Sequence, residues 1–198
     1  MQNSGRCVYL VDDQPSVLES MEFMLNSYGY RIVSFERGED FLKQAKLDQA
    51  GCVILDSRMP GLRGQEVHQL LNEQASPLSV IYLTGHGDVP MAVDALKAGA
   101  YDFFQKPVNG DQLVAAIDKA LAESERRMEE IAQRQILEVL TNREKQVLAV
   151  IGQGLKNQQI ADKLCVSLRT VEVHRSNIMK KLEVTSVASL MVKVGHLL

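Results

Sequence analysis

The sequence predicts a two-domain protein in which an α/β domain, built on a doubly wound parallel sheet, precedes a smaller all-α domain. Up to about residue 122, short apolar runs alternate with amphipathic helical patterns, which is typical of βαβ units. Beyond that point the strand-like runs stop, while helix-start signals continue. The length of 198 residues is long for one ordinary domain and short for three, which agrees with this division.

Strands and helices are expected to alternate five times in the first domain. The expected strands are Cys7–Val11, Tyr30–Ser34, Cys52–Leu55, Val80–Leu83 and Tyr101–Phe104. The expected helices are Pro15–Tyr28, Gly38–Leu47, Gly64–Gln74, Val89–Ala98 and Asp111–Ala122. Because parallel strands need crossover connections, this alternation predicts a parallel sheet with helices on its faces.

The segment after the last predicted strand favours a long helix. Residues 122–136 are rich in charged side chains and contain neither Gly nor Pro, so we expect them to extend the preceding helix. We therefore predict a first domain at residues 1–122, a helical linker at 123–136 and a second domain at 137–198.

The second domain carries the layout of a helix-turn-helix. Thr141 and Glu144 have the spacing of a capping box, which predicts a helix from Asn142. Asn157 and Ser167 are the expected N-caps of the next two helices. These helices are predicted over Gln158–Leu164 and Arg169–Lys181. A short helix, a tight turn and a longer helix make up this motif.

Charge separates the two domains. The net charge is −3, but residues 1–121 hold 10 Lys and Arg against 16 Asp and Glu, whereas residues 137–198 hold 9 against 5. A basic second domain suits a nucleic-acid partner. The start of the chain shows no signal peptide and no apolar run long enough to span a membrane, so we expect a cytoplasmic protein without a membrane partner. Three cysteines without metal-site spacing predict reduced thiols.

Polar residues follow the predicted strands, where ligand sites of doubly wound sheets lie. They are Asp12, Asp13, Asp56, Thr84 and Lys106. Clustered carboxylates repel one another unless a cation such as Mg²⁺ joins them. Asp56 is the candidate nucleophile for a phosphoryl group, Lys106 would neutralise the developing charge, and Thr84 would donate to a phosphate oxygen.

Four motifs resemble bacterial receiver domains of the CheY-like (βα)5 fold: VDD (Val11–Asp13), LDSRMPG (Leu55–Gly61), LTGHGD (Leu83–Asp88) and KP (Lys106 and Pro107). The resemblance implies that a sensor histidine kinase phosphorylates Asp56, and that Mg²⁺ is held by Asp12, Asp13, Asp56 and the backbone carbonyl of Arg58. It also implies a cis peptide before Pro107 and a switch in which Thr84 and Phe103 move together.

Two other interpretations compete with this one. A phosphohydrolase with an Asp nucleophile needs a second Asp two residues later as its acid and base, and Arg58 stands there, so we expect no turnover enzyme. A DNA-binding regulator that works without phosphorylation is the second alternative. Phe103 is itself open to a purely structural interpretation as a core aromatic residue.

The segment from about residue 138 to 195 resembles the LuxR-type helix-turn-helix of NarL/FixJ response regulators, and is most similar to the FixJ branch. Its clearest part is TVEVHRSNIMKKL, residues 170–182. Helical spacing predicts that Val171, Ile178 and Leu182 are buried, and that Lys181 shares the opposite face with the DNA-contacting residues. The resemblance implies a four-helix domain with DNA contacts from Arg169, Thr170, Glu172, Val173, His174, Ser176, Asn177 and Lys180.

Together the two resemblances imply a transcriptional response regulator of a two-component system. Phosphorylation of Asp56 is expected to promote a two-fold homodimer that binds inverted half-sites in double-stranded promoter DNA. Activation of transcription, with RNA polymerase as a further partner, is the expected outcome. Glu172 stands where the NarL branch commonly has Lys, which predicts a shifted base preference.

Overall fold

The computed structural model describes residues 7–85 and 89–195. The chain divides into two compact units, residues 1–128 and residues 129–198, and each is considered by itself. Within the described ranges, no helix is long and apolar enough to cross a membrane.

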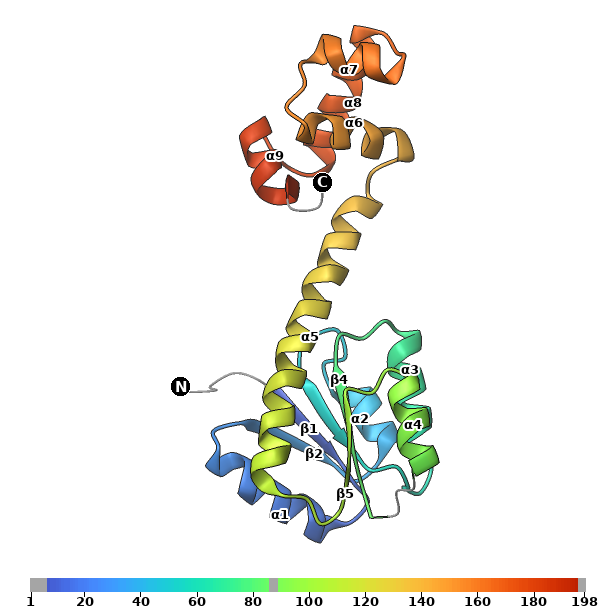
Figure 1. Ribbon diagram of the computed structural model, residues 1–198, viewed down its shortest axis with the longest axis vertical. Coiled ribbons are helices and arrows are strands. Elements are labelled where there is room, and N and C mark those ends of the chain that lie inside the picture. Colours follow the sequence, from blue (N-terminus) through green and yellow to red (C-terminus); the bar gives the residue numbers. More distant parts are fainter. Residues whose placement is uncertain (1–6, 86–88, 196–198) are drawn as a thin grey trace. The chain divides into compact units, whose positions relative to one another are not determined.

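The first unit contains a five-stranded parallel sheet in the order β2-β1-β3-β4-β5 (Figure 1). The strands are β1 (Cys7–Val11), β2 (Arg31–Phe35), β3 (Cys52–Leu55), β4 (Ser79–Thr84) and β5 (Asp102–Gln105). The central strands β3 and β4 are buried along their whole length, as expected when helices cover both faces. The order reverses between β1 and β3, which makes the carboxyl ends of these strands the switch point of the sheet.

Helices cover the two faces of the sheet, as Figure 1 shows. One core includes residues of α1 (Pro15–Ser27) and α5 (Gly110–Glu138) packed on the sheet. The opposite core includes residues of α2 (Gly38–Gln44), α3 (Gly64–Glu73) and α4 (Val89–Lys97). Strand alternation explains the division, because successive side chains point to opposite faces: Val8 and Leu10 belong to the first core, and Tyr9 and Val11 to the second.

Helix α5 continues through the segment expected to be a linker. Ser124 is fully buried, accepts a hydrogen bond from the Gly51 amide at 2.9 Å and donates to the Pro77 carbonyl at 2.7 Å. These bonds attach α5 to two loops of the first unit, beyond the expected boundary at residue 122. Farther along, Ile136 and Leu137 pack against the core of the second unit.

The second unit contains α6 (Asn142–Gly152), α7 (Asn157–Leu164), α8 (Leu168–Lys181) and α9 (Val187–Val194). Fully buried residues from all four of these helices form one core, among them Val147, Ile160, Ile178 and Val194. Helix α6 begins as expected, because Thr141 Oγ1 accepts from the Glu144 amide at 3.3 Å while Glu144 accepts from the Thr141 amide at 2.8 Å. The four helices agree with the expected all-α domain.

The turn between α7 and α8 contains one correct and one wrong expectation. Ser167 caps α8 as predicted, and its hydroxyl accepts from the Thr170 amide at 3.1 Å. The expected N-cap at Asn157 is wrong, because Asn157 is the first residue of α7 and Lys156 takes the cap position. The Gln159 side chain accepts from the Lys156 amide at 2.9 Å, which lets the helix begin one residue earlier. Cys165 makes the tight turn in the left-handed conformation, with φ 52°.

Candidate functional site

The parallel sheet gathers four of the expected site residues at one edge. Asp12 follows β1, Asp56 follows β3, Thr84 ends β4 and Lys106 follows β5. Asp12, Asp56 and Thr84 are buried, with 5%, 6% and 1% of their surface exposed. Because all strands run in the same direction, residues that are far apart in the sequence meet beyond their carboxyl ends.

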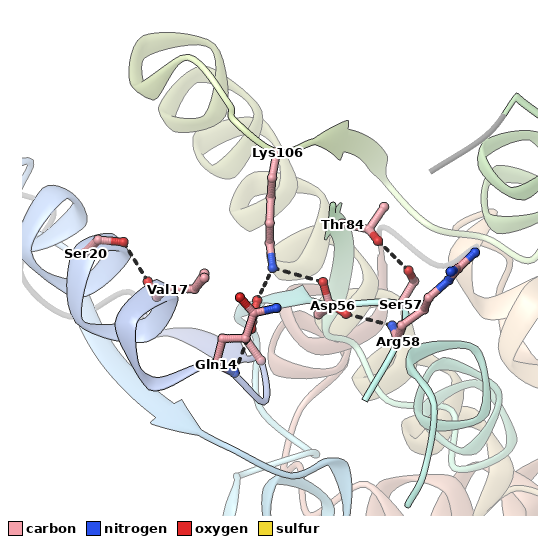
Figure 2. Close-up of polar contacts among 9 residues, drawn as sticks. Gln14, Val17, Ser20, Asp56, Ser57, Arg58, Thr84 and Lys106 are labelled. Atoms are coloured by element: carbon pink, nitrogen blue, oxygen red, sulfur yellow. Dashed lines mark hydrogen bonds and ion pairs between the residues drawn. The ribbon is translucent and has the colours of Figure 1, made fainter. Parts of the chain in front are cut away.

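Lys106 joins the two buried carboxylates, as Figure 2 shows for its bond to Asp56. Its ammonium lies 3.0 Å from Oδ1 of Asp56 and also donates to Oδ2 of Asp12. Burial acts to lower the pKa of Lys106, but the hydrogen bonds and charges of Asp12 and Asp56 outweigh it, so the pKa is raised. Lys106 is therefore charged at neutral pH and compensates two carboxylates that would otherwise repel each other. The peptide bond from Lys106 to Pro107 is cis, as expected.

Backbone amides fix the orientation of the same carboxylates. Oδ2 of Asp56 accepts from the Arg58 amide at 2.7 Å (Figure 2), and Oδ1 of Asp12 accepts from the Gln14 amide at 3.0 Å. Asp13, the residue after Asp12, is partly exposed, and the N-cap of α1 is Gln14.

Thr84 has a partner that the sequence analysis missed. Ser57, directly after Asp56, donates to Oγ1 of Thr84 at 2.6 Å, and both residues are 1% exposed (Figure 2). The one sequence feature that could have indicated this contact is that a hydroxyl residue, Ser57, directly follows the candidate nucleophile. The contact forms because β3 and β4 are neighbouring strands. Leu55 lies opposite Tyr82, so the ends of the two strands are close together.

Phe103 lies in β5 and is partly buried on the face covered by α3 and α4. Its ring centre lies 6.2 Å from that of Tyr82 on the neighbouring strand. Phe104 points to the opposite face and packs with the α1 and α5 core.

The donor set fits a hard divalent cation. Among the described residues no three His, Cys, Asp or Glu side chains gather as a metal site. Mg²⁺ needs no such cage, because one or two carboxylates with waters and phosphate oxygens suffice. Two buried carboxylates, Asp12 and Asp56, meet at Lys106, and the Arg58 amide donates to Asp56. These oxygens suit Mg²⁺ better than a soft metal that prefers nitrogen or sulfur. The His86–Asp88 part of the third motif lies outside the described residues.

Helix α8 presents a continuous exposed face in the second unit. Val171 and Ile178 are fully buried and Leu182 is 2% exposed, as expected. Six of the eight expected DNA-contacting residues are exposed: Arg169, Glu172, Val173, Ser176, Asn177 and Lys180. Thr170 and His174 are partly buried. Mixed acidic, basic, polar and apolar groups on one helix face are suited to base edges and phosphates.

Lys181 is exposed on α8, as expected, and it also makes an ion pair within this domain. Its ammonium lies 2.7 Å from Oε2 of Glu144, a carboxylate at the start of α6 that is 3% exposed. Burial acts to raise the pKa of Glu144, but hydrogen bonds from Lys181 and Thr141 prevail and lower it. Lys181 thus connects the end of α8 to the start of α6.

Two family models each match a separate part of the chain. Residues 8–118 match the response regulator receiver domain, and residues 138–194 match the bacterial regulatory proteins of the luxR family. The tetrathionate response regulatory protein TtrR of Salmonella typhimurium is 44% identical over 92% of this chain and 89% of its own length. The transcriptional regulatory protein FixJ of Bradyrhizobium diazoefficiens is 39% identical over 92% and 91%.

Solved structures of response regulators are also similar to this chain over nearly its whole length. The response regulator StyR is 40% identical with a TM-score of 0.70, over 96% of this chain and 98% of its own. Full-length FixJ from B. japonicum is 36% identical with a TM-score of 0.59, over 99% and 100%.

A CheY-like receiver with its carboxylates and lysine at the switch point, joined to a LuxR-type helix-turn-helix, defines the class of two-component response regulators. This chain belongs to the FixJ-like response regulators, which regulate transcription and are not turnover enzymes. Receiver domains of this family generally bind Mg²⁺ at the phosphorylation site.

Proposed function

We propose that Asp56 accepts a phosphoryl group from the phosphohistidine of a sensor histidine kinase, and that this event promotes dimerisation and promoter binding. The observation that carries the proposal is the position of Asp56: a buried carboxylate at the switch point, held by a backbone amide at 2.7 Å and by Lys106 at 3.0 Å. A fixed nucleophile beside a fixed positive charge is what in-line phosphoryl transfer requires.

The proposed transfer exchanges one bond for another. A carboxylate oxygen of Asp56 attacks phosphorus and forms the new O–P bond, while the N–P bond of the phosphohistidine breaks. The electron pair of that bond returns to the imidazole nitrogen, which takes a proton. Lys106 stabilises the negative charge that develops on the phosphoryl oxygens, and the Thr84 hydroxyl donates to one of them.

The proposed metal site consists of Asp12, Asp13, Asp56 and the backbone carbonyl of Arg58. Bound there, Mg²⁺ would neutralise negative charge on the phosphoryl group. The chain's own contribution is to hold Asp12 through the Gln14 amide and Asp56 through the Arg58 amide, which keeps their oxygens directed at the same region.

The proposed output runs through Thr84 and Phe103 to a two-fold dimer. A symmetric dimer would present two copies of α8 to inverted half-sites about one helical turn apart or closer. Arg169, Thr170, His174, Asn177 and Lys180 would contact phosphates or flanking bases. Glu172, Val173 and Ser176 would contact base edges. Transcriptional activation, through contact with RNA polymerase, is the proposed result.

The test is the mass of the full chain in solution, measured by light scattering with Mg²⁺ and beryllofluoride, a phosphoryl mimic. We expect the mass to double for the wild type and to stay unchanged for Asp56→Ala. A DNA-binding assay with and without the mimic completes the experiment. Binding to promoter DNA that is equal for both proteins in both conditions would contradict the proposal and favour a regulator that works without phosphorylation.

A further inference from the structure

The hydroxyl groups of Ser57 and Thr84 form a buried hydrogen bond beside the candidate phospho-acceptor. Ser57 Oγ donates to Thr84 Oγ1 at 2.6 Å, and with each residue 1% exposed, water does not compete for the bond. The distance is at the short end for hydroxyl pairs, which indicates a well-formed bond. In Figure 2 the two side chains point toward each other, while Asp56 faces Lys106.

Asp56 and Ser57 are the first two residues after strand β3, and the chain bends at Ser57. The Asp56 carboxylate is directed toward Lys106, and the Ser57 hydroxyl is directed toward Thr84 at the end of β4. One short segment therefore supplies the nucleophile and, with the next residue, contacts the hydroxyl that would bind the phosphoryl oxygen.

We propose that Ser57 is a positioning residue that retains the Thr84 hydroxyl in the unphosphorylated protein and so weakens binding of the phosphoryl group. The inference rests on the proposed function of Asp56 and Thr84. When Thr84 turns to a phosphoryl oxygen, the Ser57 hydroxyl loses its acceptor in a buried position. A buried polar group without a partner is costly, so Ser57 shifts the equilibrium toward the unphosphorylated arrangement.

The expected size of this effect follows from a typical hydrogen bond. Its net contribution corresponds to about a five-fold change in an equilibrium constant. We expect Ser57→Ala to bind beryllofluoride, at fixed Mg²⁺ concentration, about five-fold more tightly than the wild type. Fluorine NMR of the full chain measures this affinity directly from the protein-bound signal.

A double-mutant cycle separates this role from a general structural effect. In a Thr84→Val background, which lacks the hydroxyl, Ser57→Ala should leave beryllofluoride affinity unchanged, because the retained partner is already absent. Ser79→Ala is the matched control, because Ser79 begins the same strand β4, is fully buried, and its hydroxyl has no hydrogen-bond partner within the described part of the chain. We expect no change of affinity for this variant.

The outcomes distinguish the inference from the function on which it rests. Failure of the wild type to bind beryllofluoride, with Asp56→Asn equally silent, would overturn the proposed function and the role of Ser57 with it. Binding by the wild type together with unchanged or weaker binding by Ser57→Ala overturns the inference alone. An equal gain in affinity with and without the Thr84 hydroxyl would overturn it too, since Ser57 would then act by another route.

Discussion

The ammonium of Lys106 lies 3.0 Å from Oδ1 of Asp56 and binds Asp12 at the same time, so one cation compensates two buried carboxylates. The Lys106 side chain is 19% exposed, and those of Asp12 and Asp56 are 8% and 6% exposed. Removal of one partner from such a cluster leaves charge buried without compensation. The stability of the first unit should therefore depend on this lysine.

We expect Lys106→Met to lower the free energy of unfolding by about 3 kcal/mol at neutral pH, because the two carboxylates then repel each other. Urea unfolding of the full chain, followed by circular dichroism, measures the loss. Mg²⁺ should restore more stability to this variant than to the wild type. Lys119→Met, on the exposed surface of α5, is the control and should change little. An equal effect of both variants would count against the cluster.

Ser124 makes a separate prediction about where the first unit ends. Its hydroxyl bridges the Gly51 amide and the Pro77 carbonyl, so Ser124→Ala leaves two buried backbone groups without their partner. We expect a loss of about 1–3 kcal/mol in unfolding free energy, measured by urea unfolding of the full chain. Ser20→Ala on the exposed side of α1 is the control. If the two variants were equally stable, residue 122 would be the better boundary.

The pair of Glu144 and Lys181 predicts a pH dependence. The pKa of Glu144 in the folded chain lies below its ordinary value of 4.5, so the stabilisation is fully present above pH 4.5 and is lost as the pH falls through the lowered pKa. Glu144→Gln should cost about 1–2 kcal/mol near neutral pH and progressively less in acid. Hydrogen exchange of the α6 and α8 amides, measured across this pH range, provides the test. Glu138→Gln is the control, because Glu138 is exposed. If Glu144→Gln cost as much stability in acid as at neutral pH, the ionised carboxylate would not be what stabilises the domain.

Two residues on the α8 face predict different effects on DNA binding. Lys180→Ala should weaken binding to all duplexes about equally and reduce the salt dependence by about one unit of slope, because one phosphate contact is lost. Glu172→Gln should instead change the preferred sequence, because an acidic side chain accepts from the cytosine amino group. Selection from a randomised duplex library and salt titrations separate the two effects, and each variant serves as the control for the other. Identical behaviour of both would contradict the assigned face.

The sequence predicted the strands of the main chain better than the contacts between side chains. Apolar runs located β1 and β3 to the residue, and parallel topology then determined that Asp12 and Asp56 meet at one edge. Pairs such as Ser57 with Thr84 depend on which strand ends become neighbours, and local pattern does not contain that information. Lys181 shows the same limit, since its partner Glu144 lies 37 residues away.

The prediction of Asn157 as an N-cap was wrong because of a local hydrogen bond. Asparagine is a favoured N-cap, but the helix gained a hydrogen bond by starting one residue earlier, where the Gln159 side chain accepts from Lys156. Competition between two adjacent caps is decided by small energy differences, so residue preferences alone do not resolve it.

Phosphoryl transfer to Asp56 is the central claim, and intact-protein mass spectrometry after incubation with Mg²⁺ and a small acyl phosphate donor tests it most directly. We predict that the wild type gains the mass of one phosphoryl group, that hydroxylamine removes it, and that Asp56→Asn, which keeps the size of the side chain, gains none. A wild type that gains no mass, or an Asp56→Asn variant that gains as much as the wild type, would contradict the claim.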